Sequence, residues 1–510
     1  MLGKVQSMGV FGIDAYPVEV EVYVAGASMP KMTIVGLPDT AVKESADRVQ
    51  AALKNSGYYF PVRHITVNLA PADRKKEGPA FELPIALGLL EAFDVFKPAV
   101  EARYGIVGEL ALDGRVRKVN GCLSMALKCR DEGLDGIIVP AENASEAGVV
   151  KGLRVLPVQH LTEAVDFLSG ERKLQPVRMD VDRIFQRASQ YESDFAEVRG
   201  QEHTKRALEV SAAGGHNVLM IGPPRAGKSM LAQRMCGIMP TMEFEESLET
   251  TRIYSVSGHL EGDTPLLAAR PFRAPHHTVS TAGLVGGGTN PKPGEISLAH
   301  HGVLFLDELP EFSRHTLEAL RQPLEEGKTT ISRASTTGTY PSRFMLVAAM
   351  NPCPCGYWTH PKKECQCGSH DRKRYRNRVS GPLMDRIDIH VEVPPVEYRE
   401  LRSERRGETS ESIRSRVEKA RERQVRRFGD ASFFTNSGMQ MRHVREHCAL
   451  DSDAEGLLRQ AMESLGLSAR AYTKILKVSR TIADLEGADG ILPQHVSEAI
   501  NYRTLDRSQQ

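Results

Sequence analysis

The sequence predicts an α/β fold class, with three parts in series: an α+β N-terminal domain, a central core with a parallel sheet, and a helical C-terminal domain. Three observations support this prediction. Over the first ~170 residues, short β-type apolar runs alternate with segments of helical period. In the middle of the chain, an apolar run passes directly into a glycine-rich loop and then into a helical segment. Beyond Pro394-Pro395, apolar residues recur at helical spacing.

Length, composition and charge show which classes of protein the chain can belong to. The chain has 510 residues, of which 41% are hydrophobic and 26% charged, as in ordinary globular proteins. With 66 basic and 65 acidic side chains the net charge is +1, so any basic surface for nucleic acid must be local. No apolar run approaches the ~20 residues of a membrane span, and no secretory signal opens the chain. We therefore expect a cytoplasmic protein with no membrane contact.

The N-terminal domain is expected to cover residues 1–172. Val18–Val24 alternates apolar and polar residues with period two, as a half-buried strand does. A polar stretch at residues 173–194, with Pro176, predicts a linker to the next domain. Further strands are expected at His64–Leu69, Tyr104–Leu112, Ile137–Pro140 and Leu153–Leu156, and helices at Thr40–Leu53 and Leu83–Phe93.

The central core, residues 195–395, contains a phosphate-binding motif. The apolar run Asn217–Ile221 leads into the G-x-x-x-x-G-K-S sequence at residues 222–229, and a helical segment follows. Such a loop wraps backbone N–H groups around phosphates, and the new helix adds its N-terminal amides. We expect Lys228 to reach the β- and γ-phosphates and Ser229 to hold Mg²⁺. The nucleotide is expected to contact Gly222, Pro223, Pro224, Arg225, Ala226, Gly227, Lys228 and Ser229.

Two further apolar runs end in polar residues. Gly302–Leu306 ends in Asp307 and Glu308, where Asp307 would hold Mg²⁺ through water and Glu308 would polarise the attacking water. A third run, ending at Met350, is followed by Asn351, which would face the γ-phosphate; the alternative is a turn asparagine before a proline. Together these elements predict hydrolysis of ATP or GTP.

The C-terminal domain, residues 396–510, is expected to be helical. Ile413, Val417 and Ala420 mark one face of a charged helix, which Gly429 would end. Further helices are expected around residues 457–465 and 475–482, and after Pro493.

Four of the eight cysteines crowd into residues 353–367: Cys353, Cys355, Cys365 and Cys367. In a cytosolic chain, clustered cysteines are metal ligands more often than disulfides. Four thiolates would hold a structural Zn²⁺ tetrahedrally and brace the loop. The two C-x-C pairs depart from the usual C-x-x-C spacing, so disulfides and free thiols stay open. His360 or His370 could replace one cysteine.

Local basic segments favour a nucleic-acid partner. Lys362-Lys363 and Arg372–Arg378 form a basic run on the cysteine loop. A glycine-rich loop at Gly283–Thr289 and a hairpin predicted at Glu326–Ala334 are similar in position to the pore loops of helicases, which makes both candidate pore loops, with Lys328 expected at the hairpin tip. Phosphate contacts of this kind give salt-dependent binding without sequence preference. The predicted DNA contacts are Lys292, Lys328 and Arg333; the alternative for each loop is a subunit interface.

The three polar-ended strands, in this order, resemble the AAA+ ATPases. Val198–Gln201 is similar to the adenine-side loop of that class. Gly381–Asp388 resembles the stretch that carries a subunit-boundary arginine in the magnesium-chelatase and MCM branch, which implies that Arg386 is an arginine finger acting in trans. Ser468–Tyr472 is similar to the segment that supplies a lid arginine, so the resemblance implies that Arg470 is a second sensor.

Both arginines have a structural alternative. Arg386 could instead form a salt bridge with Asp385 or Asp388, and Arg470 could be an ordinary surface residue of the lid.

Nearly the whole chain resembles the YifB/ComM family of magnesium-chelatase-like AAA+ proteins. The resemblance implies a homo-oligomeric ring, most simply a hexamer, that hydrolyses ATP with Mg²⁺ and drives branch migration on single-stranded or branched DNA. A chelatase-type motor with partner subunits and a protein-remodelling ATPase are the alternatives. The stretches that carry the resemblance are Thr33–Asp39, Arg270–His277, Pro293–His300, Leu306–Phe312 and Asn351–Gly356.

The N-terminal domain resembles the Lon protease domain at Lys76–Phe81 and Gly108–Arg115. Lon proteases use a Ser–Lys dyad in which the lysine deprotonates the serine. Ala80 stands at the serine position and Leu123 near the lysine position, so the resemblance implies a retained fold without peptide hydrolysis. It thus implies a P-loop AAA+ core between a Lon-protease-like domain and a helical lid. A basic surface of unknown use is expected from Arg63, Arg74, Lys75 and Lys76.

Overall fold

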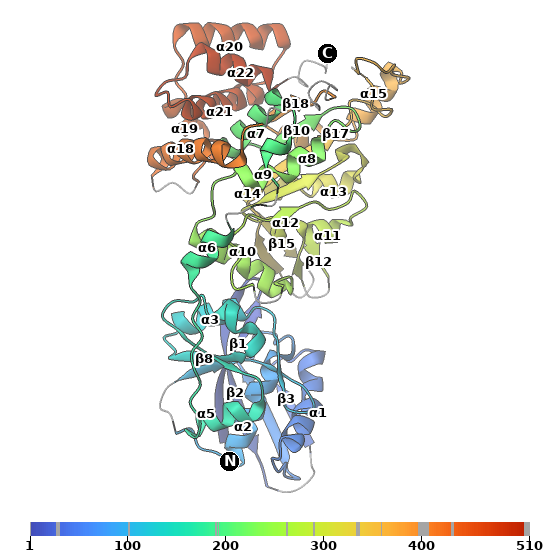
Figure 1. Ribbon diagram of the computed structural model, residues 1–510. Coiled ribbons are helices and arrows are strands. Elements are labelled where there is room, and N and C mark those ends of the chain that lie inside the picture. The colour runs from blue at the N-terminus through green and yellow to red at the C-terminus, as the bar shows by residue number, and fades with distance from the viewer. Residues whose placement is uncertain are drawn as a thin grey trace. The chain divides into compact units, whose positions relative to one another are not determined.

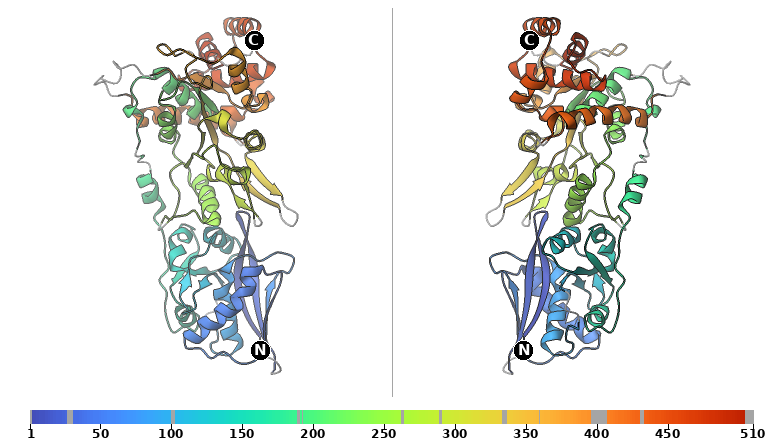
Figure 2. Two further views of the ribbon diagram at one scale, coloured as in Figure 1. Left: turned by 90° about the vertical axis from the view of Figure 1, so that its right-hand side faces the viewer. Right: turned by 90° about the vertical axis from the view of Figure 1, so that its left-hand side faces the viewer.

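The computed structural model describes residues 2–26, 31–99, 103–188, 191, 193–261, 264–288, 291–332, 337–358, 360–395, 407–429 and 433–503. The chain divides into two compact units (Figures 1 and 2). Unit 1 comprises Met1–Arg187 and Phe244–Ala268, and unit 2 comprises Ala188–Glu243 and Ala269–Gln510. No helix in the described ranges has the length and hydropathy needed to cross a membrane.

Unit 1 is built on a four-stranded sheet in the order β1-β2-β4-β3, in which only β3 and β4 pair in parallel. A second, parallel sheet has the order β5-β8-β9. The strands are β1 Leu2–Phe11, β2 Asp14–Val24, β3 Lys31–Val35, β4 His64–Ala70, β5 Tyr104–Ile106, β6 Glu109–Leu110, β7 Val116–Arg117, β8 Gly136–Pro140 and β9 Arg154–Val158. The helices are α1 Thr40–Asn55, η1 Pro79–Phe81, α2 Glu82–Ala92, α3 Cys122–Asp131, α4 Ala144–Ala147, α5 Leu161–Leu168 and α6 Val181–Ala188.

The strand expected at Tyr104–Leu112 is divided into β5 and β6. Gly108, between them, donates its N–H to the carbonyl of Ala80 at 2.9 Å and accepts from the N–H of Leu83 at 3.0 Å. Because the backbone of Gly108 is bonded to the η1–α2 segment, it cannot also pair within a sheet.

The expected linker contains helix α6, whose Ile184 and Phe185 pack against the apolar cluster around α3. Unit 1 also takes in helix α10 (Phe244–Ser257), which the sequence had placed in the core. Arg252 of α10 donates to the carbonyl of Ile13 at 2.9 Å, and Ser255 Oγ donates to Glu146 Oε2 at 2.6 Å. The polar sequence of α10 does not indicate these partners, which lie over a hundred residues earlier in the chain.

Unit 2 contains a five-stranded parallel sheet in the order β11-β14-β17-β10-β18. Its strands β10, β14 and β17 are buried along their whole length, as their continuous apolar runs predict. Because all strands point the same way, the residues that follow β10, β14 and β17 meet at one edge of the sheet. The strands are β10 Val218–Ile221, β11 Phe272–Arg273, β14 Val303–Leu306, β17 Met345–Met350 and β18 Ile389–Glu392.

Helices surround this sheet in the central part of the chain (Figure 1). They are α7 Glu202–Gly214, α8 Lys228–Gln233, α9 Met235–Ile238, α11 Thr281–Val285, α12 Glu295–Leu298, η4 Leu309–Glu311, α13 Arg314–Glu318, α14 Arg321–Glu326, α15 Ser369–Arg376 and α16 Gly381–Met384.

Two antiparallel hairpins extend from unit 2. The first pairs β12 (Gly286–Gly287) with β13 (Lys292–Pro293), and the second pairs β15 (Lys328–Ser332) with β16 (Thr337–Pro341). The prediction that Lys328 lies at the hairpin tip is wrong, because Lys328 pairs with Pro341 at the end away from the turn. Arg333 lies outside the described residues, whereas Lys292 and Lys328 are both exposed.

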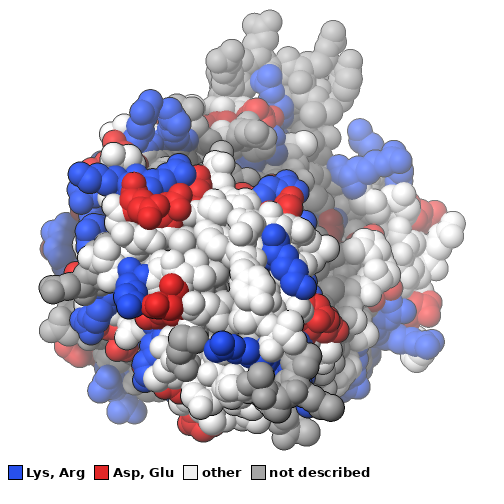
Figure 3. Space-filling model, turned by 90° about the horizontal axis from the view of Figure 1, so that it is seen from below, with Lys and Arg blue, Asp and Glu red and all other residues white. Residues whose placement is uncertain are grey.

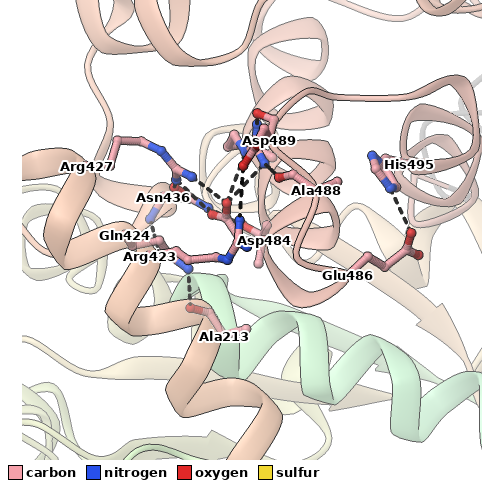
Figure 4. A network of polar contacts seen from close by, with 12 residues as sticks. Ala213, Arg423, Gln424, Arg427, Asn436, Asp484, Glu486, Ala488, Asp489 and His495 are labelled. Carbon is pink, nitrogen blue, oxygen red and sulfur yellow. Dashed lines mark hydrogen bonds and ion pairs between the residues drawn. The ribbon is translucent and has the colours of Figure 1, made fainter.

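The C-terminal helices form a bundle (Figure 1): α18 Ser410–Phe428, α19 Met441–His447, α20 Ser452–Leu465, α21 Ala469–Leu485 and α22 Pro493–Asn501. Helix α18 ends at Gly429, as expected. A polar network holds the bundle together (Figure 4): buried Asp484 accepts from Arg427 at 2.8 Å and from Asn436 at 2.9 Å. Gln424 donates to the carbonyl of Ala213 at 3.0 Å and so connects the bundle to α7.

Candidate functional site

A pocket of about 430 Å³ lies at the carboxyl edge of the unit 2 sheet. The structure brings together here the three elements that the sequence singled out: the glycine-rich loop after β10, the acidic pair after β14, and the asparagine after β17. The lining residues are Pro224, Arg225, Ala226, Gly227, Lys228, Ser229, Met230, Asp307, Glu308, Met350 and Asn351.

The loop has a backbone that few other sequences could adopt. Arg225 and Gly227 have positive φ angles of 66° and 92°. A Cβ atom on Gly222 would lie 2.2 Å from the carbonyl oxygen of Val393, so only glycine fits there. Helix α8 begins at Lys228, directly after the loop. Its first amides therefore face the pocket, which is the arrangement that binds phosphate groups.

Lys228 is buried in this pocket and held by three oxygen atoms. Its Nζ donates to the carbonyls of Gly222 at 2.7 Å and Pro223 at 3.0 Å, and to Asn351 Oδ1 at 3.2 Å. Burial lowers the pKa of Lys228, against the opposing effect of Asp307 and Glu308. A partly desolvated ammonium group beside open loop amides is suited to bind a polyanion.

Ser229 and Asp307 are placed to share a cation. Ser229 Oγ donates to Asp307 Oδ2 at 2.7 Å, and the other oxygen of that carboxylate accepts from the N–H of Glu308 at 2.9 Å. A hydroxyl and a carboxylate are the oxygen ligands that Mg²⁺ prefers beside phosphate groups, so the donor set fits the expected ion.

Glu308 has the most unusual backbone of the acidic pair, with a φ of 52°. Its side chain is 56% exposed, and its Oε2 lies 3.4 Å from Nδ1 of His277. His277 was not predicted from the sequence to be a site residue. It follows β11, and only the strand order places β11 beside β14 and thus His277 beside Glu308.

Arg386 and Arg470 do not line this pocket. The carbonyl of Arg386 accepts from Asn217 Nδ2 at 2.9 Å, and Asn217 directly precedes β10. Both arginines therefore lie toward the amino edge of the sheet, opposite the loop, since the side chain of Arg470 pairs with Asp385.

The side chain of Arg386 forms an ion pair with Glu325, rather than with Asp385 or Asp388 as the structural alternative assumed. Burial lowers the pKa of Arg386, and the nearby charges of Arg321 and Arg470 lower it further. Asp388 instead contacts His216 and Lys474, each at 3.1 Å.

The four cysteines of the loop after Asn351 form one cluster, in which all thiol sulfurs lie within 4.8 Å of one another. Sγ of Cys353 is 3.4 Å from that of Cys355 and 3.7 Å from that of Cys365. A tetrahedral zinc with Zn–S bonds of ~2.3 Å requires sulfurs about 3.8 Å apart, so the cluster fits this ion. Among the described residues, neither His360 nor His370 joins the cluster.

The cysteine loop also contacts the phosphate-binding loop. A Cβ atom on Gly356, where φ is 82°, would lie 2.6 Å from Cδ of Pro224. The backbone of Gly356 thus lies so close to the ring of Pro224 that glycine is required, and a brace on the cysteine loop also supports the phosphate-binding loop.

In unit 1, the two residues that the resemblance places at the Lon-type dyad are apolar and closed to solvent. Ala80 and Leu123 are both buried in the cluster around α3. The expected basic surface forms only in part. Arg63, Arg74 and Lys75 are exposed, whereas Lys76 is fully buried, with its Nζ donating to the carbonyls of Pro71 and, at 2.8 Å, Arg74. In the face of unit 1 shown in Figure 3, basic and acidic side chains alternate around a largely uncharged centre.

Three family models match the chain in succession. Residues 18–143 match a model described as subunit ChlI of Mg-chelatase, residues 194–401 match magnesium chelatase, subunit ChlI, and residues 407–503 match the C-terminal part of that subunit.

Relatives extend the similarity to the whole chain. The uncharacterized protein YifB of Salmonella typhimurium is 44% identical over 510 residues, which cover 99% of this chain and 98% of that protein. The competence protein ComM of Haemophilus influenzae is 44% identical over 515 residues, with the same coverage of each chain. The Lon protease of Halothermothrix orenii is 28% identical over 152 residues, or 28% of this chain and 19% of the protease.

Proposed function

Because the chain belongs to the YifB/ComM family of magnesium-chelatase-like AAA+ ATPases, we propose that it is an ATP-driven ring motor that acts on DNA. Its action would be that of a helicase that promotes branch migration during recombination or natural transformation. The observation that carries the ATPase part of this proposal is the pocket in which Lys228, the Asp307–Glu308 pair and Asn351 converge.

The pocket residues have distinct parts in hydrolysis. Lys228 neutralises charge on the β- and γ-phosphates, and Ser229 and Asp307 hold Mg²⁺. Bound Mg²⁺ supplies Lewis-acid stabilisation of the developing phosphate charge. Glu308 orients and polarises the attacking water, and Asn351 directs its amide toward the γ-phosphate.

The position of Arg386 supports a ring. A four-residue strand, about 13 Å long, separates the edge that holds Arg386 from the edge that holds the phosphate-binding loop. Arg386 therefore acts on the nucleotide of a neighbouring subunit, once its pairing with Glu325 opens. Arg470, beside it, belongs to the same subunit boundary. Repeating this head-to-tail contact closes a ring, most simply a hexamer.

The DNA partner is supported by two features. Exposed Lys292 and Lys328 lie on the two hairpins that extend from unit 2, and a relative is named a competence protein. The proposed substrate is single-stranded or branched DNA. A chelatase-type motor and a protein-remodelling ATPase are the competing functions, since their nucleotide pocket would be the same.

Two accessory parts complete the proposal. The four cysteines hold a structural zinc, because four protein thiolates leave no open position for catalysis. Unit 1 hydrolyses no peptide, since the buried Ala80 and Leu123 offer neither a nucleophile nor a base.

The ATPase rate, measured with and without single-stranded and branched DNA, tests the proposal. We expect DNA to stimulate hydrolysis by the wild-type protein, and Lys228→Ala to show neither basal nor stimulated activity. Clear ATPase activity that no DNA alters would exclude the DNA motor and favour a porphyrin-linked or protein-remodelling role.

A further inference from the structure

Helix α15 (Ser369–Arg376) has three faces with three different environments. Tyr375 points into the core and is buried. Arg372 and Arg376, one turn apart, lie over the ring of Trp358 with guanidinium carbons 5.0 and 4.6 Å from its centroid. The third face is formed by residues at helical spacing that continue past the end of α15: His370, Lys373, Arg374, Asn377 and Arg378.

This third face lines a pocket of about 860 Å³, the basic groove. Across the groove lie Pro310, Glu311, Phe312 and Arg314. The one carboxylate among these residues, Glu311, is bonded to Arg378 at 2.7 Å. Lys373 and Arg374 are exposed and form no ion pair in the described part of the chain. The groove therefore has a local excess of positive charge in a chain whose net charge is only +1.

The basic groove and the nucleotide pocket are lined by neighbouring segments of the chain. Residues 309–311 form η4, which directly follows Glu308, so one continuous segment supplies Glu308 to one pocket and Glu311 to the other. On the opposite wall, Tyr375 of α15 belongs to the same buried apolar cluster as Met350, the residue directly before Asn351. A ligand that draws α15 and η4 together would therefore shift both Glu308 and Asn351.

We propose that the basic groove binds the phosphodiester backbone of a nucleic-acid strand and that this binding adjusts Glu308 and Asn351 for hydrolysis. The inference rests on the proposed function and gives it a second DNA contact, separate from the hairpin lysines. It also supplies a physical route by which DNA stimulates the ATPase.

The lining favours nucleic acid over an acidic protein. Guanidinium groups match phosphate oxygens in a bidentate way, and cations three and four residues apart on a helix are ~5–6 Å apart, which suits a row of anions. Apart from Pro310 and Phe312 the lining residues are polar, and the groove offers no strand edge for a peptide. A regularly charged backbone is therefore the ligand whose chemistry fits.

The test compares the double variant Lys373→Ala/Arg374→Ala with the double variant Lys419→Ala/Arg426→Ala. The second pair removes the same charge from exposed positions of α18, outside the groove. Binding of a labelled single-stranded oligodeoxynucleotide is measured by fluorescence anisotropy over a range of salt concentrations, in full-length protein.

We expect the groove variant to bind about tenfold more weakly or worse. The slope of log K against log salt should fall by about 1.4, because each single-strand phosphate contact contributes ~0.7. The ratio of DNA-stimulated to basal ATPase rate should drop toward one in the groove variant and stay at the wild-type value in the α18 variant.

The outcomes separate this inference from the proposed function. If wild-type protein neither binds DNA nor responds to it, the proposed function fails. If wild-type protein binds and both variants bind equally well, the groove is not the site and only this inference is overturned. If the groove variant loses binding to polyglutamate or to inorganic triphosphate but binds the oligonucleotide as wild-type protein does, this inference is also overturned.

Discussion

The side chain of Glu308 is paired with His277, a residue that lies outside the phosphate-binding loop, the acidic pair and Asn351. The Glu308 carboxylate is more than half exposed, and among the described residues it pairs with His277. An exposed carboxylate has many rotamers, so a partner that limits them positions the base for the attacking water.

Glu308→Gln should lower kcat at least 100-fold and leave the KM for ATP nearly unchanged, since the amide keeps the shape but cannot polarise water. His277→Ala should lower kcat by a smaller factor, because it removes only the positioning. His277→Asn, which retains a hydrogen-bond donor, should restore part of the loss. Steady-state ATPase kinetics measure all three variants. The positioning role would be contradicted if His277→Asn had as low a kcat as His277→Ala, or if His277→Ala changed the KM for ATP instead of kcat.

At this scale the sequence was most informative where a motif fixes both residue type and context. Lys228, Ser229, Asp307, Glu308 and Asn351 all line or contact the predicted pocket. His277 and the Arg386–Glu325 pair could not be predicted, because each depends on which strands and helices become neighbours in space.

Among the elements, the cysteine loop is expected to depend on its metal. The purified protein should contain about one zinc ion per chain, since four thiolates fill a tetrahedral site. Cys355→Ser and Cys365→Ser should each lose the zinc, and their ATPase activity should fall because Gly356 of this loop contacts Pro224 of the phosphate-binding loop. Elemental analysis and ATPase assays measure the two effects. Full activity in zinc-free variants would show that the loops are not coupled.

Strand β18 carries a buried histidine, His390, that makes the free energy of unfolding depend on pH. Burial lowers the pKa of His390 well below its usual value, and the charges of Arg503 and Lys474 add to this, whereas Asp388 opposes it. Neither ring nitrogen has a hydrogen-bond partner among the described residues. Below about pH 6.5, His390 is protonated in the unfolded chain but stays neutral in the folded state. The free energy of unfolding therefore falls as the pH falls below about 6.5, and His390 does not change it above about pH 6.5.

His390→Leu should therefore protect the protein against mild acid. Relative to this variant, wild-type protein should lose about 1.4 kcal/mol of stability per pH unit below pH 6.5, and the two should be similar at pH 7.5. Thermal unfolding at pH 7.5 and pH 5.5 measures the difference. A gap between the two proteins that does not change with pH would contradict the assignment.

Elements were predictable where the apolar pattern was regular, as in β2, α1, β10 and β17. Strand β1 was missed because glycines and a serine interrupt its alternation. The division between β5 and β6 was missed because it depends on the hydrogen bonds of Gly108 to a distant segment.

For the whole molecule, the opposite-edge placement of Lys228 and Arg386 makes a subunit-mixing experiment decisive. Lys228→Ala and Arg386→Ala should each be inactive alone. In an equal mixture, about a quarter of the boundaries would combine an intact phosphate-binding loop with an intact arginine of the neighbour, and activity should return in that proportion. ATPase assays of mixed and separate variants provide the measurement, and no recovery on mixing would place Arg386 outside the neighbour's site.

Helix α10 has a consequence for how this chain can be inherited. The polypeptide passes between the two units three times, near residues 187, 243 and 268. Unit 1 therefore draws part of its core from a stretch encoded inside the ATPase sequence. A gene rearrangement that moved only the first 187 codons would carry away an incomplete domain and leave its missing helix behind. We therefore expect the two units to be inherited together. A natural homologue that lacks unit 1 must also have lost or rebuilt the α10 segment.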